Sequence, residues 1–370
     1  MVYRVLLFAL LLLCCFDATS PYTSSARQAA SWTIEATSWP EADALFRKDA
    51  RWLGADDAYS LDLGGGRVLW LFADTFIATS AANVRRESKM IRNSVAIQQG
   101  YDPSSATIKF YWRTENNKPT SFFAEAGKVW YWPGHAIRLG NKLLIFLMKI
   151  HAVKTGLGFD SAGWSAVLID NPDSEPSQWK LQWLQVPQNK FRVVLGSASV
   201  LQLGECIYAF SSQETREHNI YLVRWRVTQA SQGNLRTPEW WTGNSWIPQS
   251  QVQVLPAPVF TGGQTEFTVH YEPTRKQFLQ VQHVGFGAAE LAVRWAEKIT
   301  GPWSLPQKFY RPPEADRKST LIYACKSHPE LTGADLVLTY VVNHSDFGQL
   351  LDDASIYYPR FLKGRFKTTQ

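Results

Sequence analysis

The sequence predicts an all-β protein that folds as a five-bladed β-propeller, and three observations carry this prediction. Short runs rich in β-branched and aromatic residues, bounded by Gly, Pro and Asn, recur along the chain, whereas helical periodicity is hard to find beyond residue 30. A strand–turn–strand pattern occurs five times, and a third strand follows each copy. The 370 residues include 16 Trp, 14 Tyr and 20 Phe, which suit packing between sheets.

The five repeats define the expected strands. The hairpins are expected at residues 61–72, 137–146, 200–210, 269–281 and 331–340, and the third strands at residues 93–98, 164–169, 220–225, 291–295 and 356–361. Such units, with centres 55 to 72 residues apart, are typical of propeller blades. A large β-sandwich is the alternative, but its strands need not recur in threes. No segment is long or polar enough to be a linker, so residues 31–364 are expected to form one domain.

The first 20 residues are expected to be a signal peptide. Arg4 precedes an apolar run at residues 5–16, which is too short to span a bilayer comfortably. We therefore expect an exported protein that is secreted, periplasmic or associated with the cell envelope. Cys14 and Cys15 leave a lipoprotein open as an alternative, and an uncleaved membrane anchor is another.

Charge and cysteine content exclude several classes of protein. The net charge is +6, and the charges are scattered without a block of like signs, so nucleic acid is not an expected partner. Cys206 and Cys325 lie more than a hundred residues apart in apolar runs, which favours two buried thiols over a disulfide or zinc site. The local motifs of serine hydrolases, nucleotide-binding enzymes and zinc proteases are missing, and no metal or cofactor is expected.

Polar residues near the first strand of each repeat indicate where chemistry could occur. In a propeller the innermost strands line the axis, so residues from different blades meet at one end of it. These residues are Asp56, Asp57, His135, Ser197, Glu266 and His328.

The first hairpin contains the most specific candidates. If it folds symmetrically about Gly65, Asp56 and Asp74 are directly opposed on neighbouring strands. Two carboxyl groups this close repel, so one is expected to stay protonated while the other is ionised. A proton donor beside a carboxylate is what the cleavage of a glycosidic bond requires. The sequence therefore predicts Asp56 and Asp74 as the catalytic pair of a glycoside hydrolase.

Other interpretations of these residues remain open. Asp56 and Asp74 could cap turns or pair with Arg92 or Arg51, and a register slip of one residue would place Asp57 on the face given to Asp56.

Several further side chains are candidates for substrate binding. Glu266 could be a third acidic member of the site or the partner of an arginine. His135 and His328 could bind sugar hydroxyls, tune an acid, or have a structural role. Trp132 and the Trp240–Trp241 pair could stack on sugar rings, although most of the tryptophans must fill space between blades.

Five segments resemble a known family. Residues 54–63, 67–77, 92–98, 131–134 and 265–271 together resemble the propeller family catalogued as domain of unknown function 4185, whose members are classed as endo-D-arabinanases of glycoside hydrolase family 183. The resemblance implies a five-bladed propeller that hydrolyses α-D-arabinofuranosyl linkages in the arabinan of mycobacterial-type envelopes. It maps the family's two catalytic aspartates onto Asp56 and Asp74, and Asn93 of the third segment joins the substrate-binding candidates.

We therefore expect an exported, endo-acting glycoside hydrolase whose partner is an arabinan-type polysaccharide. A non-catalytic glycan-binding propeller of the envelope, or a hydrolase of another furanoside polysaccharide, is the alternative. No protein partner is implied, and a monomer is expected.

Overall fold

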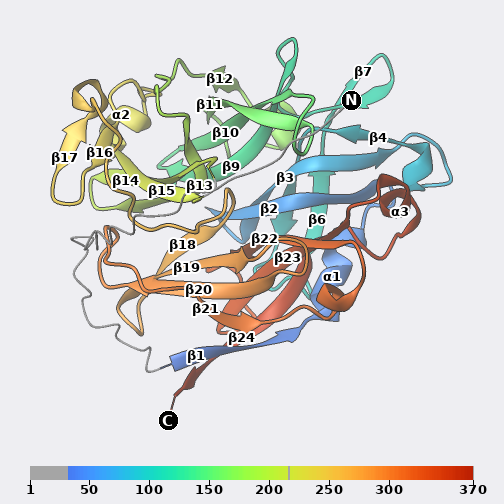
Figure 1. Ribbon diagram of the computed structural model, residues 1–370. Helices are drawn as coiled ribbons and strands as arrows, with labels where there is room; N and C mark the ends of the chain where they lie inside the picture. Colours follow the sequence, from blue (N-terminus) through green and yellow to red (C-terminus); the bar gives the residue numbers. More distant parts are fainter. Residues whose placement is uncertain (1–31, 216, 370) are drawn as a thin grey trace, which may run out of the picture. The chain divides into compact units, whose positions relative to one another are not determined.

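The computed structural model describes residues 32–215 and 217–369, which belong to one compact unit (Figure 1). The prediction of an all-β, five-bladed propeller is confirmed, because five antiparallel sheets follow one another along the chain. The expected signal peptide at residues 1–20, with Cys14 and Cys15, lies outside the described residues. Among the described residues, no helix has the length and apolar character needed to cross a membrane.

Blade I contains both residues of the predicted catalytic pair. Its strands are β2 (Trp52–Gly64), β3 (Arg67–Ala78), β5 (Ser94–Gln99) and β6 (Thr107–Tyr111), and β4 (Ser88–Ile91) pairs with the last part of β3. The turn between β2 and β3 lies at Gly65 and Gly66, which both have positive φ angles, 63° and 77°, that glycine adopts without strain. The hairpin therefore folds where the sequence predicts it.

Blades II, III and IV repeat the same order of strands. Blade II contains β9 (Val129–Leu139), β10 (Lys142–Ala152), β11 (Phe159–Ile169) and β12 (Leu181–Trp183). Blade III contains β13 (Val193–Leu203), β14 (Cys206–Gln213), β15 (Asn219–Arg226), β16 (Glu239–Trp241) and β17 (Trp246–Pro248). Blade IV contains β18 (Thr268–Glu272), β19 (Gln277–Val284), β20 (Glu290–Ala296) and β21 (Gln307–Tyr310).

Blade V joins the two ends of the described chain. It contains β22 (Thr320–Ser327), β23 (Leu336–His344) and β24 (Arg360–Thr368), and its outer strand is β1 (Trp32–Ser38). The seven residues of β1 pair antiparallel with β24, from Trp32 opposite Thr368 to Ser38 opposite Leu362 (Figure 1). Because the first strand completes the last sheet, the ring of blades is closed by backbone hydrogen bonds.

The sequence misplaced two strands of this last blade. The fifth hairpin begins with β22 at Thr320, not at Leu331, and Leu331 lies in the connection to β23. The third strand begins at Arg360 instead of residue 356. Both errors arise because the connections on either side of β23 hold apolar residues such as Leu331 and Ile356, which are buried without being part of a strand.

In the described part of the chain, helical residues are confined to short segments in the connections. The α-helices are α1 (Pro40–Asp43), α2 (Val227–Ala230) and α3 (Phe347–Asp352), and the 3₁₀ helices are η1 (Ala44–Arg47), η2 (Arg85–Glu87), η3 (Pro176–Gln178), η4 (Gln249–Gln251) and η5 (Pro313–Asp316). A separate hairpin, β7 (Arg113–Glu115) with β8 (Lys118–Thr120), lies between blades I and II in sequence.

The hydrophobic core lies between adjacent blades. Phe146 of blade II, for example, stacks on Trp164 of its own sheet and packs against Trp225 of blade III, with ring centroids 5.9 and 5.7 Å away. Similar clusters join blades V and I, blades I and II, and blades III and IV. Cys206 and Cys325 are buried free thiols, which confirms the expectation from their spacing.

The first strands of the blades surround the axis. β2 contacts β9, β9 contacts β13, β13 contacts β18, β18 contacts β22, and β22 contacts β2. The first strands run in the same direction. Between β22 and β2, for example, Tyr323 contacts Asp56, and further along both segments His328 contacts Ser60. We call the end of the propeller at which these strands begin the site end. The connections between second and third strands lie at this same end.

Candidate active site

Asp56 and Asp74 both lie at the site end, Asp56 near the start of β2 and Asp74 near the end of β3. The register predicted around Gly65 holds where Tyr59 pairs with Leu71, and again where Ala55 pairs with Thr75. Between these pairs the ladder is irregular, so Asp56 and Asp74 are not a regular cross-strand pair.

Two residues in left-handed conformation cause this irregularity. Asp57 and Ala58 have φ angles of 75° and 61°, which are uncommon for residues other than glycine. In a regular strand Asp56 and Asp57 would point to opposite faces. The break in the alternation lets both side chains reach polar partners around the axis. Strained backbone of this kind is often found at functional sites.

Asp74 is held as a carboxylate by two donors. Arg92 Nη1 lies 3.1 Å from Asp74 Oδ2, and the indole Nε1 of Trp132 donates to Asp74 Oδ1 at 2.9 Å. Burial raises the pKa of Asp74 above its usual value, and the charge of Arg92 and the hydrogen bonds from Trp132 and Arg92 limit that rise. The side chain exposes 16% of its area, so solvent or a ligand can reach it. The pairing with Arg92 that the sequence left open is therefore present, and Asp74 remains accessible beside it.

Asp56 is in a different environment. Tyr323 donates a hydrogen bond of 2.8 Å to Asp56 Oδ2, and Asn343 donates to the Tyr323 hydroxyl at 2.9 Å. The other carboxyl oxygen, Oδ1, has no hydrogen-bond partner. Burial, followed by the charges of Asp74 and Glu266, raises the pKa of Asp56 to about 8. Asp56 is therefore a neutral acid at pH 7, beside a carboxylate on the next strand.

A close backbone approach brings a second tyrosine to the pair. A Cβ atom at Gly54 would lie 2.2 Å from the carbonyl oxygen of Tyr357, so only glycine permits the contact between β2 and the connection that follows β23. The Tyr357 hydroxyl donates to the backbone oxygen of Asp74 at 3.0 Å. Arg85 fixes the same connection, because its guanidinium donates to the backbone oxygens of Leu350, Asp353 and Ile356.

Asp57 and Glu266 meet at a buried lysine. Lys326 Nζ lies 2.8 Å from Asp57 Oδ1 and 3.1 Å from Glu266 Oε2. The side chains of Asp57 and Lys326 expose no area, whereas Glu266 exposes 20%. Glu266 therefore pairs with a lysine and not with the arginine that the sequence analysis left open. Asp57 is buried, so its side chain does not reach solvent.

Of the four other predicted residues, Asn93, Ser197 and His328 are buried, and His135 is half-buried. Asn93 is fully buried and donates to the backbone oxygens of Phe123 and Tyr131. Ser197 is buried and shares a hydrogen bond of 3.1 Å with Ser212. Each of these contacts has a structural effect, because it joins neighbouring strands or segments.

The two histidines are also part of the polar interior. His135 Nδ1 accepts a hydrogen bond from the backbone of Val200, and His328 lies between Ser60 and Thr339. Burial lowers the pKa of His135 to about 4 and that of His328 well below its usual range. Both rings are therefore neutral at pH 7, which is consistent with the structural role left open by the sequence.

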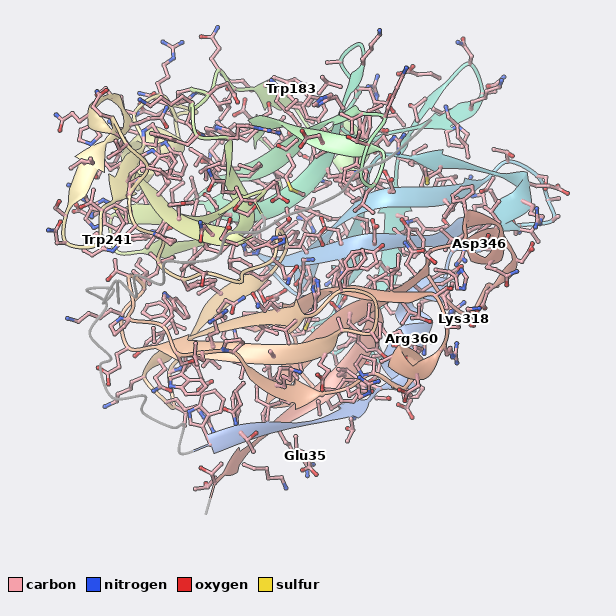
Figure 2. All side chains as sticks on the ribbon, in the orientation of Figure 1. Glu35, Trp183, Trp241, Lys318, Asp346 and Arg360 are labelled. Carbon is pink, nitrogen blue, oxygen red and sulfur yellow. The ribbon has the colours of Figure 1, made fainter. Side chains whose placement is uncertain are left out.

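The predicted aromatic residues divide between the site and the periphery. Trp132 packs edge-on against Phe159, with 4.7 Å between ring centroids, next to Asp74. Trp240 and Trp241 belong to β16, near the outer edge of blade III, and Trp241 is labelled in Figure 2. The Trp241 ring packs on Trp246 of β17. Trp132 can thus meet a ligand at Asp74, whereas the Trp240–Trp241 pair supports the outer strands.

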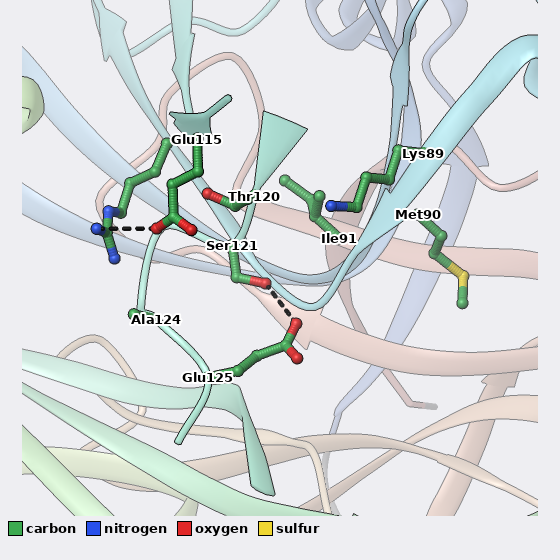
Figure 3. A pocket seen from close by; sticks show the side chains of 9 residues that line it. Lys89, Met90, Ile91, Glu115, Thr120, Ser121, Ala124 and Glu125 are labelled. Carbon is green, nitrogen blue, oxygen red and sulfur yellow. Dashed lines mark hydrogen bonds and ion pairs between the residues drawn. The ribbon is translucent and has the colours of Figure 1, made fainter. Parts of the chain in front are cut away.

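A cavity of about 230 Å³ lies beside the site, between β4 and the hairpin β7–β8 (Figure 3). It is lined by Lys89, Met90, Ile91, Arg113, Glu115, Thr120, Ser121, Ala124 and Glu125. The cavity is connected to the carboxyl pair through Arg92, whose backbone N–H donates to Ser121 Oγ at 3.0 Å. In addition to burial, the charge of Glu125 raises the pKa of Asp74. None of the predicted site residues lines it.

Sequence reasoning missed Tyr323, Lys326 and Tyr357. All three belong to blade V, where the first strand was not recognised. One signal was available, since Lys326 is a charged residue directly after the apolar residues Ala324 and Cys325. Within the described part of the chain, no group of three or more His, Cys, Asp or Glu side chains is arranged to hold a metal ion.

The fold and the site together define a five-bladed propeller with a neutral acid and a carboxylate at one end of its axis. The family model described as "Domain of unknown function (DUF5005)" matches residues 41–365. The chain belongs to this family. The resemblance of the five segments to domain of unknown function 4185, and with it the assignment to glycoside hydrolase family 183, is not confirmed. The comparison with curated proteins found no match.

Solved structures show the same architecture. A candidate hydrolase from Bacteroides ovatus ATCC 8483 superposes with a TM-score of 0.70 at 14% identity, with 90% of each chain covered. A xylan β-1,4-xylosidase from Bacillus halodurans C-125 has a TM-score of 0.50 at 9% identity, over 84% of this chain and 52% of that chain. At such low identities the similarities show the fold.

Proposed function

We propose that the protein is an endo-acting glycoside hydrolase in which Asp56 is the general acid and Asp74 the carboxylate that acts on the anomeric carbon. The observation that carries the proposal is the difference between the two aspartates. Asp56 is neutral at pH 7 because its pKa is raised to about 8, whereas Asp74 is bound by Arg92 and Trp132. Pairs of carboxyl groups whose environments separate their pKa values are typical of acid–base catalysis.

Each step of glycosidic cleavage can be assigned to these two groups. Asp56 protonates the departing glycosidic oxygen as the bond to the anomeric carbon breaks. Asp74 either attacks that carbon or removes a proton from a water that does so. Arg92 and Trp132 keep Asp74 ionised for this role, and Tyr323 orients Asp56.

We further propose an arabinan with α-D-arabinofuranosyl linkages as the substrate, because the five segments that resemble the arabinanase family include both aspartates. The apolar run at residues 5–16 supports export, with action outside the cytoplasm or in the cell envelope, and a monomer is sufficient because both groups come from one chain.

Incubation with purified arabinan tests this function. New reducing ends should appear with the wild type and with the surface variant Asp316→Asn, whose side chain is 75% exposed and remote in sequence from both aspartates. Asp74→Asn should lower the rate by about 10²- to 10⁴-fold, the usual contribution of one acid–base group. If the wild type binds arabinan without releasing reducing ends, the protein is a glycan-binding propeller and the proposal is wrong.

A further inference from the structure

Three ionisable groups from three blades meet beside the carboxyl pair: the buried Asp57 of β2, the half-buried Glu266 before β18, and the buried Lys326 of β22. Besides the two carboxyl contacts, Lys326 Nζ donates to the backbone oxygen of Asp57 at 2.7 Å. It also lies 4.2 Å from the centre of the Tyr59 ring. The ammonium group is thus fully enclosed by the groups that it contacts.

One ammonium group cannot compensate two carboxylates in this position. A buried charge without a partner costs several kcal/mol, so a buried cluster tends towards neutrality by binding or releasing a proton. With Lys326 charged, one of the two carboxyl groups must therefore be protonated.

The contacts of the two carboxyl groups differ. Glu266 Oε2 accepts a hydrogen bond from Lys326 at 3.1 Å, and the side chain keeps 20% of its area in solvent. Asp57 is fully buried; Lys326 Nζ lies 2.8 Å from its Oδ1, and its Oδ2 has no hydrogen-bond partner. A carboxylate is stabilised by donors and by solvent. Both groups lie within 3.1 Å of the same ammonium, and of the two only Glu266 also reaches solvent.

We propose that Asp57 is a neutral carboxylic acid and Glu266 a carboxylate paired with the Lys326 ammonium, and that Asp57 and Lys326 are positioning residues that keep the charge of Glu266 next to Asp56. This assignment of charges to Asp57, Glu266 and Lys326 does not depend on the proposed function. Its catalytic consequence, that Glu266 helps to keep Asp56 protonated, rests on the proposed function.

The electrostatics of the surroundings agree with this distribution. Burial and the charge of Glu266 raise the pKa of Asp57 well above its usual range. Burial also acts to raise the pKa of Glu266, but Lys326 and the adjacent Asp57 outweigh it, and the pKa is lowered. The other titratable groups that act on this cluster are Asp56, Tyr59, His135, His283, Tyr323, Cys325 and His328. Among these neighbours, His135, His283, His328 and Cys325 have shifted pKa values that keep their side chains neutral at pH 7.

Matched amide substitutions test the assignment without any substrate. Asp57→Asn replaces a neutral acid by a neutral amide of the same shape, and asparagine tolerates the φ of 75° at this position. Its melting temperature at pH 7 should stay close to that of the wild type. Glu266→Gln leaves the buried cation only the fully buried Asp57 as a carboxyl partner, so its melting temperature should fall clearly below that of Asp57→Asn. The reverse order, or equal losses, overturns the proposal.

A double variant covers the case in which Glu266→Gln does not fold. Adding Lys326→Met to Glu266→Gln removes the cation, so that Asp57 can stay neutral, and should restore a cooperative melting transition. Adding Lys326→Met to Asp57→Asn leaves Glu266 without its cation and should lower the melting temperature. Carbon NMR of protein labelled at the aspartate carboxyl groups gives a direct measurement. Two of the signals, those of Asp56 and Asp57, should keep the chemical shift of a protonated acid from pH 5 to 7, and one of them should be lost in Asp57→Asn. An ionised Asp57 over this range contradicts the proposal.

The catalytic consequence has its own measurement. Glu266→Gln should move the alkaline limb of kcat/KM to lower pH, because one of the charges that raise the pKa of Asp56 is removed. Glu205→Gln, at a side chain that is 88% exposed, should leave the limb in place. An alkaline limb that does not move in Glu266→Gln refutes the link to Asp56. If the wild type cleaves no glycan at all, the proposed function fails, while the melting and NMR measurements still decide the charge distribution.

Discussion

Tyr323 of blade V donates a hydrogen bond of 2.8 Å to Asp56 of blade I, although 267 positions separate the two residues in the sequence. The contact exists because β1 completes the sheet of blade V, which brings β22 against β2 around the axis. The proposed general acid is thus oriented across the closure of the ring, and its protonation depends on a residue that no local motif contains.

Removing this hydroxyl should change the pH dependence of activity in a defined direction. The hydrogen bond from Tyr323 favours ionised Asp56, against the larger effects of burial, Asp74 and Glu266. In Tyr323→Phe the pKa of Asp56 should rise above about 8, and the alkaline limb of kcat/KM should move to higher pH. A hydrogen bond to a charged group contributes about 1.5 to 3 kcal/mol, or roughly one to two pH units.

The control for this experiment is Tyr271→Phe, which removes a hydroxyl from a residue that is 44% exposed and lies at the hairpin end of β18. Its pH profile should match the wild type. An alkaline limb that moves to lower pH in Tyr323→Phe would show that Asp56 does not act as the proton donor.

Asp56 should also reduce stability as the pH rises. In the folded protein it keeps its proton up to about pH 8, whereas in the unfolded chain it releases the proton near the usual value of 3.8. Between these values the folded state binds more protons, so the free energy of unfolding falls by up to about 1.4 kcal/mol for each pH unit. Asp56→Asn removes this penalty.

Urea unfolding of both proteins at several pH values checks this expectation. The stability of Asp56→Asn relative to the wild type should increase from pH 4 to pH 8 and level off above it. A difference that is constant over this range would mean that Asp56 titrates normally in the folded state. Asp316→Asn, at an exposed side chain, should follow the wild type throughout.

The architecture and the carboxyl pair could be predicted from the sequence because both depend on local patterns. The hairpin about Gly65 has its turn marked by three consecutive glycines, so the placement of Asp56 and Asp74 at the same end of the hairpin follows from strand geometry, but the direct opposition of the two side chains does not hold. The irregularity at Asp57 and Ala58 could not be predicted, because neither residue type signals a positive φ.

The side chains that blade V contributes to the site could not be predicted from local patterns. Ala324 has a φ of 53°, and the register of β22 shifts between Tyr323 and Lys326, which lets both side chains reach the site from one strand. A period-two pattern would place them on opposite faces. Similarly, the neutral state of His135 and His328 depends on burial among strands of several blades, and sequence spacing carries no information about it.

Trp132 should control the ionisation of Asp74. Its indole N–H donates to Asp74 Oδ1 at 2.9 Å and opposes the effect of burial on the pKa. In Trp132→Phe the pKa of Asp74 should rise, so the acidic limb of kcat/KM should move to higher pH. Trp130→Phe is the matched control, because Trp130 Nε1 has no hydrogen-bond partner and the new ring still lies under Arg92. Equal profiles for the two variants would remove Trp132 from the mechanism.

Arg85 should be essential for holding Tyr357 at the site. The residue is 5% exposed, and its guanidinium donates to four backbone oxygens, one of them from Leu53 and three from the connection that carries Tyr357. Hydrogen bonds to a charged group contribute about 1.5 to 3 kcal/mol each, so Arg85→Ala should lower the free energy of unfolding by more than about 3 kcal/mol.

Amide hydrogen exchange of Arg85→Ala should be faster at residues 350–357 than in the wild type, and proteolysis should begin in this segment, because its backbone oxygens lose their common donor. The adjacent Arg86 provides the control. Its ion pair with Asp352 lies on the surface, where both side chains are more than half exposed, and such pairs contribute little. Arg86→Ala should therefore change neither unfolding nor exchange. Comparable losses of stability in Arg85→Ala and Arg86→Ala would mean that positive charge near residues 350–357 holds this segment, and not the hydrogen bonds of the buried Arg85 guanidinium.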